Sequence, residues 1–209
     1  MARLTKAKCR ICRREGAQLF LRGSRCDSAK CSFKNNATPP GQHGAKNRRS
    51  SSYNVHLREK QKLKRMYGLM DQQFRRYFKE ALLHEGNTGE SLLICLECRL
   101  DNVLYQGCMG LSRNQSRQFI SHGHTLVNGH KVNIVSYSVR AGDVIKPAAN
   151  ETSQAMFKNS LTNSARKNQV PSWLKLSEEP MELQVVQLPK REDINVPINE
   201  QLVVEFSSR

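Results

Sequence analysis

The sequence contains few hydrophobic residues and no long hydrophobic run. Hydrophobic residues make up 38% of its 209 residues, which is below the share of about 45–50% that is usual in globular domains. A run of about 18 apolar residues, which a membrane-spanning helix would need, does not occur. The first residues also lack the apolar segment of a secretory signal, and we expect the protein to act in the cytoplasm, without a membrane partner. Its hydrophobic cores should be small.

Motifs that would indicate catalysis are missing as well. The sequence has no His-Glu-x2-His motif, no Gly-x-Ser-x-Gly motif and no glycine-rich phosphate loop. In the basic part of the chain the acidic residues are scattered between lysines, as on an ordinary helix surface. We therefore predict that the protein is not an enzyme and binds no small-molecule substrate.

Negative charge is scarce, and positive charge is concentrated in one part of the chain. The sequence has 34 Lys and Arg against 18 Asp and Glu, a net charge of +16. Residues 1–85 hold 21 basic and 6 acidic side chains, and residues 99–146 hold a smaller excess of 6 against 2. Such an excess indicates a polyanionic partner. A nucleic acid is favoured over a membrane surface, because no basic helix carries an aromatic insertion face.

Four of the seven cysteines have the spacing of a metal site. Two residues separate Cys9 from Cys12, and four separate Cys26 from Cys31. In a reducing compartment cysteines are free thiols or metal ligands and not disulfides. Because this segment is short of apolar residues, we predict one structural zinc ion that replaces a hydrophobic core. Four free thiols and an iron–sulfur cluster remain as alternatives.

Two further groups could be mistaken for metal ligands. Cys95 and Cys98 are also separated by two residues, but they fall in a predicted helix and no second pair accompanies them. His43 could replace a cysteine ligand, although the set of four is already complete without it. We predict no metal at Cys95 and Cys98, and we expect His43 to lie in a turn beside RNA.

Hydrophobic periodicity predicts helices in the middle of the chain. They are a basic helix over Tyr53–Tyr67 ended by Gly68, a helix from an N-capping Asp71 to Glu85 ended by Gly86, and a leucine-rich helix from about Gly89 to Leu104. The second of these has Phe74, Phe78, Ala81 and Leu82 on its buried stripe. Together they would form a helical platform with a modest core.

A different pattern follows, which predicts a short capped helix and several strands. Ser112 and Gln115 form a capping box for a helix that stops at Gly123. Asn128-Gly129 predicts a tight hairpin turn between two short strands. Further strand-like runs are Val139–Ile145, Leu183–Leu188 and Gln201–Phe206, and residues 150–180 suggest loose helix and loop. The predicted fold class is α+β.

The segment RLDNVLYQGCMGLSRNQSRQFISHGHTLVNGHKVNIVSYSVRAGDVI resembles the S4 RNA-binding domain. That resemblance implies two short helices packed on a small sheet, with RNA held by the second helix through Arg113, Arg117 and Gln118. The cysteine segment, PPGQHG, LREKQKLKRMYGLMDQQFRRYF and PSWL resemble the ribosomal protein S4 family in its zinc-bearing version. Two departures are His56, where Gln is expected, and an ending without an aromatic directly before the final Ser-Arg.

The resemblance implies three parts and a set of partners. The parts are a zinc-binding basic segment (1–45), a helical rRNA-binding domain (46–98, joined by the tail 197–209), and an RNA-binding module (99–196, core 99–146) with a C-terminal extension. The implied role is a structural constituent of the small ribosomal subunit that binds the 5′ domain of 16S rRNA at a multi-helix junction and nucleates 30S assembly. The implied partners are ribosomal protein S5 and the mRNA, near the channel through which mRNA enters the small subunit. An influence on translational accuracy is also implied.

Charge density and the resemblance together select the candidate RNA-binding residues. They are Arg3, Lys8, Arg10, Arg13, Arg14, Arg22, Arg25, Lys30, Lys34, His43, Lys46, Arg48, Arg49, Tyr53, Arg58, Lys60, Lys62, Lys64, Arg65, Arg75, Arg76, Arg113, Arg117, Gln118 and Lys131. Two other functions are compatible with parts of the sequence. One is an rRNA-modifying enzyme that uses the S4-like segment for targeting, but little chain remains for a catalytic domain. The other is a zinc-dependent nucleic-acid-binding regulator, for which no dimer-forming apolar stripe is visible.

Overall fold

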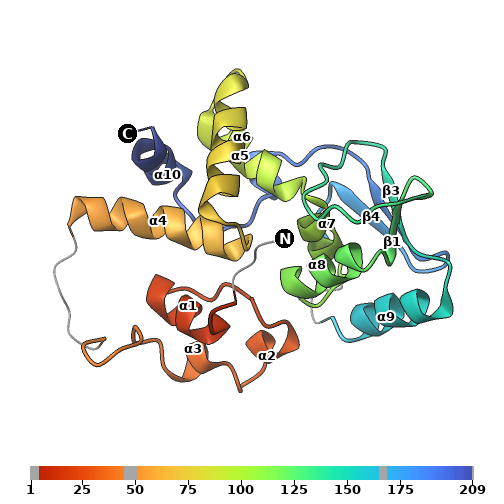
Figure 1. Cartoon of the computed structure of the whole chain (residues 1–209), viewed down its shortest axis with the longest axis horizontal. Coiled ribbons are helices and arrows are strands. Elements are labelled where there is room, and N and C mark those ends of the chain that lie inside the picture. The colour runs from red at the N-terminus through yellow and green to blue at the C-terminus, as the bar shows by residue number, and fades with distance from the viewer. Residues whose placement is uncertain (1–4, 45–50, 165–168, 209) are drawn as a thin grey trace. The chain divides into compact units, whose positions relative to one another are not determined.

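The computed structural model describes residues 5–44, 51–164 and 169–208 (Figure 1). The chain forms two compact units, one made of Met1–Leu93 with Val196–Arg209 and the other of Ile94–Asn195. Helices and one antiparallel sheet make the predicted α+β fold. Within the described part of the chain, no helix is long and apolar enough to span a membrane.

The first unit begins with three short helices around a small core. They are α1 (Lys8–Glu15), α2 (Ser24–Asp27) and α3 (Ser32–Asn35). Gly16 ends α1 in the left-handed conformation, at φ +63°, which a glycine adopts without steric cost. The core of this segment contains Ile11, Leu19, Leu21 and three of the four clustered cysteines. It is small, as the composition of the segment predicts.

Three further helices belong to this unit. The basic helix α4 (Ser52–Met66) is capped by Ser51, whose hydroxyl accepts from the Asn54 amide. It is followed by α5 (Asp71–Leu83), and the C-terminal tail returns as α10 (Glu200–Ser207). The buried faces of α4 and α5 carry Leu63, Met66, Phe74 and Phe78. The predicted helices over 53–67 and 71–85 are therefore confirmed within one or two residues at each end.

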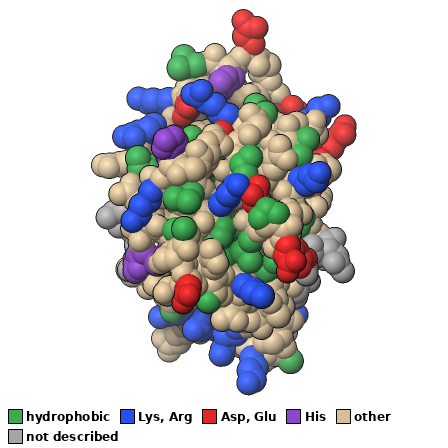
Figure 2. Space-filling view, turned by 90° about the vertical axis from the view of Figure 1, so that its right-hand side faces the viewer, with side chains coloured by type: hydrophobic (Ala, Val, Ile, Leu, Met, Phe, Trp, Pro, Cys, Tyr) green, Lys and Arg blue, Asp and Glu red, His purple; other side chains and the backbone are tan. Residues whose placement is uncertain are grey.

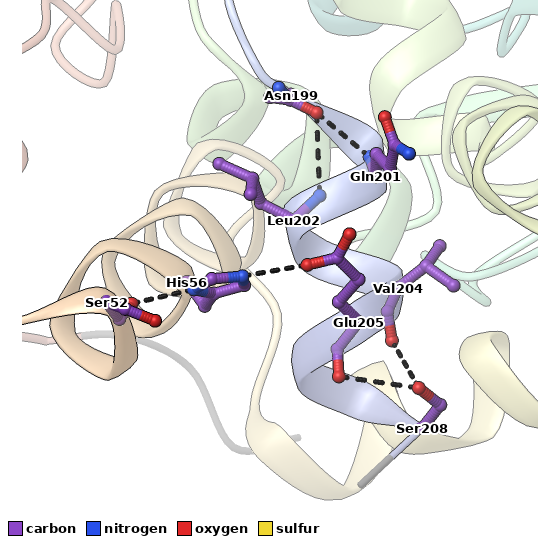
Figure 3. A network of polar contacts seen from close by, with 8 residues as sticks. All are labelled: Ser52, His56, Asn199, Gln201, Leu202, Val204, Glu205 and Ser208. Atoms are coloured by element: carbon purple, nitrogen blue, oxygen red, sulfur yellow. Dashed lines mark hydrogen bonds and ion pairs between the residues drawn. The ribbon is translucent and has the colours of Figure 1, made fainter.

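The tail α10 packs along α4 (Figure 3). His56 Nδ1 lies 2.7 Å from the Ser52 carbonyl oxygen, and its Nε2 lies 2.8 Å from Glu205 Oε2 on α10. The prediction of a strand over Gln201–Phe206 is wrong. Asn199 caps a helix there by accepting from the Gln201 and Leu202 amides, because its side chain satisfies amides that a helix start leaves unpaired.

Three further details differ from the predictions. Met70 and not Asp71 is the N-cap residue of α5, since Asp71 lies in the first turn and pairs with Lys64 and Arg75. Leu82 is 53% exposed and does not belong to the buried stripe. The leucine-rich helix is broken into α6 (Thr88–Glu97) and α7 (Leu100–Gln106).

That break has a physical cause in the second unit. Cys98 and Arg99 leave the helical conformation, and their backbone pairs with the segment around Ser138. The Val139 amide donates to the Cys98 carbonyl, and the Leu100 amide donates to the Tyr137 carbonyl, each at 2.9 Å. Backbone hydrogen bonds to a distant segment therefore take the place of the helical conformation at Cys98 and Arg99.

The second unit packs α7, α8 (Arg113–Ser121) and α9 (Glu151–Thr162) with a five-stranded antiparallel sheet of order β2-β1-β3-β5-β4. The strands are β1 (Thr125–Val127), β2 (His130–Lys131), β3 (Val144–Pro147), β4 (Leu174–Ser177) and β5 (Glu182–Val185), followed by the 3-10 turn η2 (Arg191–Asp193). Its core includes Leu104, Phe119, Ile145, Phe157 and Trp173.

Two local sequence signals in this unit, the Asn128-Gly129 turn and the Ser112 cap, are confirmed. Asn128 and Gly129 have φ of +50° and +81° between β1 and β2, as a tight hairpin turn requires. Ser112 caps α8 by accepting from the Gln115 amide at 3.3 Å. The predicted box is not reciprocal, however, because the Gln115 side chain accepts from the Leu111 amide and not from Ser112.

Candidate RNA-binding surface and cysteine cluster

The candidate RNA-binding residues differ widely in exposure. Those exposed are Arg10, Arg14, Arg22, Arg25, Lys30, Lys34, His43, Tyr53, Arg75, Arg76, Gln118 and Lys131. Those half-buried are Lys8, Arg13, Arg58, Lys62, Lys64, Arg65 and Arg117, and those buried are Lys60 and Arg113. Four more, Arg3, Lys46, Arg48 and Arg49, lie outside the described residues. Of the twelve exposed residues, ten belong to the first unit.

Two cations of α4 are bound to a buried carboxylate of α1. The side chain of Glu15 is fully buried, and its Oε1 contacts Arg65 Nη1 and lies 3.2 Å from Arg58 Nη1. Burial raises the pKa of Glu15 more than the charges of the two arginines lower it. Burial likewise lowers the pKa of Arg58 despite the nearby carboxylate. This pairing attaches α1 to α4, so both arginines already have a structural role.

Lys60 belongs to the interior of the first unit. Only 8% of the residue is exposed, and its ammonium nitrogen lies 5.5 Å from the Phe74 ring centroid and 5.1 Å from that of Phe206. Burial lowers the pKa of Lys60, partly offset by Asp71. The two rings provide cation–π contacts that compensate part of the lost hydration. Lys60 thus connects α4 with α5 and α10.

A buried ionic network underlies α7 and α8 in the second unit. Arg99 and Asp101 are each about 1% exposed and form a two-point ion pair, with Nε to Oδ1 at 3.1 Å and Nη2 to Oδ2 at 2.9 Å. Arg117 Nε lies 3.4 Å from the same Asp101 Oδ2. One carboxylate therefore holds two guanidiniums, one of which is on α8. The charge of Asp101 orients Arg117, whose side chain is 11% exposed.

Next to this ion pair, the neutral side chain of Asn102 lies between a buried arginine and a buried carboxylate. Arg113 Nε donates to Asn102 Oδ1 at 2.8 Å, and its guanidinium lies 4.4 Å from the Tyr105 ring centroid. The Asn102 amide in turn donates to the Glu97 carboxylate at 2.6 Å. Arg113, which the resemblance places against RNA, therefore contacts Asn102 and Tyr105 in the interior of this unit. Gln118 is the exposed member of the three residues so selected.

Sequence reasoning missed the acceptors of this network. Glu97, Asp101 and Asn102 stand among leucines in the segment LECRLDNVL, and all three are buried. Polar residues rarely occupy such positions unless they are hydrogen-bonded. Their position on a leucine-rich stripe was the available signal, and it would have predicted buried arginine partners.

The four clustered cysteines come from the three short helices. Cys9 and Cys12 lie on α1, Cys26 lies on α2, and Cys31 is the N-cap residue of α3. Three of them are buried and Cys9 is half-buried. Around them, the Arg22 amide donates to Cys26 Sγ at 3.3 Å, and Arg22 Nη1 lies 3.9 Å from Cys9 Sγ. The fold brings the predicted ligand set into one small part of the unit.

The electrostatics of the thiols are mixed. Burial and the neighbouring thiolates raise the pKa of Cys12 and of Cys26. Burial also acts on Cys9, but hydrogen bonds from Ser32 and Arg22 outweigh it and lower its pKa. Within the described ranges, no three His, Cys, Asp or Glu side chains are arranged as a metal site. The thiols are near enough to influence one another, and their donor chemistry suits zinc.

Comparison with known proteins covers the whole chain. Residues 3–97 match the family model described as "Ribosomal protein S4/S9 N-terminal domain", and residues 98–145 match the S4 domain. The chain is 49% identical to a protein of Clostridium tetani and to one of Clostridium botulinum, and 48% identical to one of Dictyoglomus turgidum. Each match spans 209 residues and all of both chains, and each relative is named "Small ribosomal subunit protein uS4".

Proposed function

Because the chain belongs to the uS4 family of small-ribosomal-subunit proteins, we propose that it is a structural constituent of the small subunit and binds 16S rRNA directly. The observation that carries this proposal is the full-length identity to proteins of that name. The net charge of +16 and the ten exposed candidate residues of the first unit support an rRNA partner. The relatives are named as ribosomal proteins and not as enzymes, in agreement with the prediction from the sequence.

The finer parts of the proposal concern the place of the protein in the subunit. We propose contact with a multi-helix junction of the 5′ domain of 16S rRNA, early in 30S assembly, and a position beside protein S5 and the channel through which mRNA arrives. An influence on decoding accuracy would follow from that position. These parts rest on the family resemblance, and the exposed cations of α1, α2 and α5 are consistent with them.

Binding to rRNA is tested by a filter-binding titration with full-length protein. The expected result is tight binding to small-subunit rRNA that weakens steeply with salt, and weaker binding to random RNA of equal length. Absence of a preference for the rRNA would contradict the proposal. The double variant Arg10→Gln/Arg76→Gln should reduce the salt dependence by about 1–2 in slope if both contact phosphates. Arg140→Gln/Lys175→Gln removes two exposed cations of the second unit and serves as the matched control.

We also propose that Cys9, Cys12, Cys26 and Cys31 hold one structural zinc ion. Their common location, their burial and the cations Arg22 and Arg25 nearby support it, because positive charge offsets a cluster of thiolates. Bound zinc would connect α1, α2 and α3 around a core that is otherwise small. Elemental analysis of the purified chain should give one zinc per molecule. Iron with acid-labile sulfide, or intact protein without metal, would contradict this.

A further inference from the structure

The second unit has a groove that the proposed RNA contacts do not use. Its volume is about 840 Å³, and it lies between strands β1 and β3, helix α9 and the turn that joins β4 to β5. Figure 2 looks at the side of Figure 1 on which β1, β3 and α9 lie, and it shows hydrophobic side chains gathered in the middle of that face. None of the candidate RNA-binding residues that the structure describes lines the groove.

Part of the groove lining is apolar. Leu126 contributes from β1, Ala155 and Leu161 from α9, and Pro180 and Met181 from the turn between β4 and β5. The strands alternate, so that Val127, Ile145 and Leu183 enter the core, while Leu126 and its register partner Lys146 belong to the other face. An apolar surface of this kind, left open on a sheet face, suits a partner that also has apolar side chains.

The rim of the groove has an unusual charge for this chain. Among the described residues, four carboxylates line it, Glu151, Glu178, Glu179 and Glu182, against the two cations Lys146 and Lys158. Lys146 Nζ pairs with Glu182 Oε1 at 2.5 Å, which neutralises one of the carboxylates. The described lining residues therefore have a net charge of −2 in a protein whose net charge is +16. Such a surface repels RNA phosphates and attracts cations.

We propose that this groove binds a basic, extended segment of another protein, with Lys or Arg at the rim and apolar side chains on the floor. Charge complementarity selects the cations, since Glu151 on α9 and Glu179 on the turn both present carboxylates to the groove. The apolar floor accepts the intervening side chains and the aliphatic stems of the basic residues. The described candidate RNA-binding residues do not line this groove, so the two interactions can be tested independently.

The probe for this interaction is a short fluorescent peptide that alternates Arg and Leu, titrated with full-length protein at about 0.15 M salt. Two comparison peptides replace Leu by Ser or Arg by Glu. Glu151→Gln/Glu179→Gln should weaken binding of the Arg-Leu peptide about fivefold, as expected from two partly exposed ion pairs. Ala155→Arg, which fills the groove and adds a cation, should abolish it.

Matched controls lie outside the groove. Glu80→Gln/Glu192→Gln removes two exposed carboxylates elsewhere, and Asn159→Arg adds a cation to α9 at an exposed position that does not line the groove. Both should bind the Arg-Leu peptide like the unchanged protein. All variants should keep their affinity for small-subunit rRNA, and this shows that they are folded and that a loss of peptide binding is not a loss of the rRNA function.

Several results would overturn the proposal. Peptide binding that survives Ala155→Arg would mean that the peptide binds elsewhere. Equal binding of the Arg-Ser peptide would mean that charge alone attracts it and that the apolar floor is not used. Preferential binding of the Glu-Leu peptide would assign the groove to a partner of the opposite charge. Binding of a single-stranded RNA that is lost in the Ala155→Arg variant would do the same.

Discussion

The buried pair of Arg99 and Asp101 allows a quantitative prediction for Asp101→Asn. The substitution keeps the size and shape of the side chain and removes one negative charge. Arg99, which is about 1% exposed, would then lose its two-point ion pair with Asp101, whereas Arg117 can turn toward water because 11% of its side chain is exposed. The cost therefore comes chiefly from Arg99.

The expected size of the effect follows from the burial of both partners. Removing one member of a buried ion pair typically costs about 3–5 kcal/mol, because the other charge stays dehydrated and unpaired. With a urea dependence of about 2 kcal/mol per M, the midpoint for unfolding of the second unit should fall by roughly 1.5–2.5 M. That loss is a large fraction of the stability of a typical domain.

The single tryptophan gives an assay that is specific for this unit. Trp173 is 1% exposed and lies in the core of the second unit. Its fluorescence should therefore follow unfolding of residues 94–195, while circular dichroism follows both units. Glu192→Gln, at an exposed carboxylate of the same unit, is the control and should leave the fluorescence midpoint unchanged.

A double variant separates the charge from the packing. Arg99→Met/Asp101→Leu removes both ions and leaves apolar groups of similar size, so its stability should lie close to that of the unchanged chain. A cost below about 1 kcal/mol for Asp101→Asn would refute the reasoning. So would a double variant that is less stable than the single one.

Three further predictions concern single groups. Burial raises the pKa of Cys98 to about 12, so alkylation mapped by mass spectrometry at about pH 8 should leave Cys98 unmodified in the folded chain and modify it in urea. Asn199→Ala should destabilise α10 by about 1 kcal/mol and speed hydrogen exchange of its first amides, because it removes the acceptor for two of them. Burial opposes but does not cancel the effect of Lys64, which lowers the pKa of Asp71. The ionised Asp71 therefore stabilises the fold fully above its unfolded pKa of 3.8, and this stabilisation is lost as the pH falls through the lowered pKa of the folded chain. The midpoint of thermal unfolding should accordingly fall less on acidification for Asp71→Asn than for the unchanged chain.

Signals that depend on neighbouring residues were readable from the sequence. The Asn128-Gly129 turn and the Ser112 cap are formed by backbone and side-chain geometry within a few residues, and both occur as predicted. The basic helix over 53–67 was equally clear from its periodicity. The resemblance to the S4 domain added the arrangement of helices and sheet that local patterns do not contain.

Features that depend on distant contacts were not readable. The tail over 201–206 has apolar residues that suit either a strand or a helix, and its packing against α4 decides for the helix. The leucine-rich helix breaks at Cys98 because its backbone pairs with residues about forty positions away. Burial of Lys60 similarly depends on Phe74 and Phe206, which only the fold brings together.

These contacts change how the positive charge of the chain is interpreted. A count of Lys and Arg treats each as available to a phosphate, yet Arg58 and Arg65 neutralise Glu15, and Arg113 is buried beside Tyr105. Removing such a residue would weaken RNA binding through loss of structure, with little change in the salt dependence. Removing an exposed one, such as Arg10, should change the salt dependence directly. The slope of affinity against salt, measured variant by variant, therefore separates cations that stabilise the fold from cations that bind the polyanion.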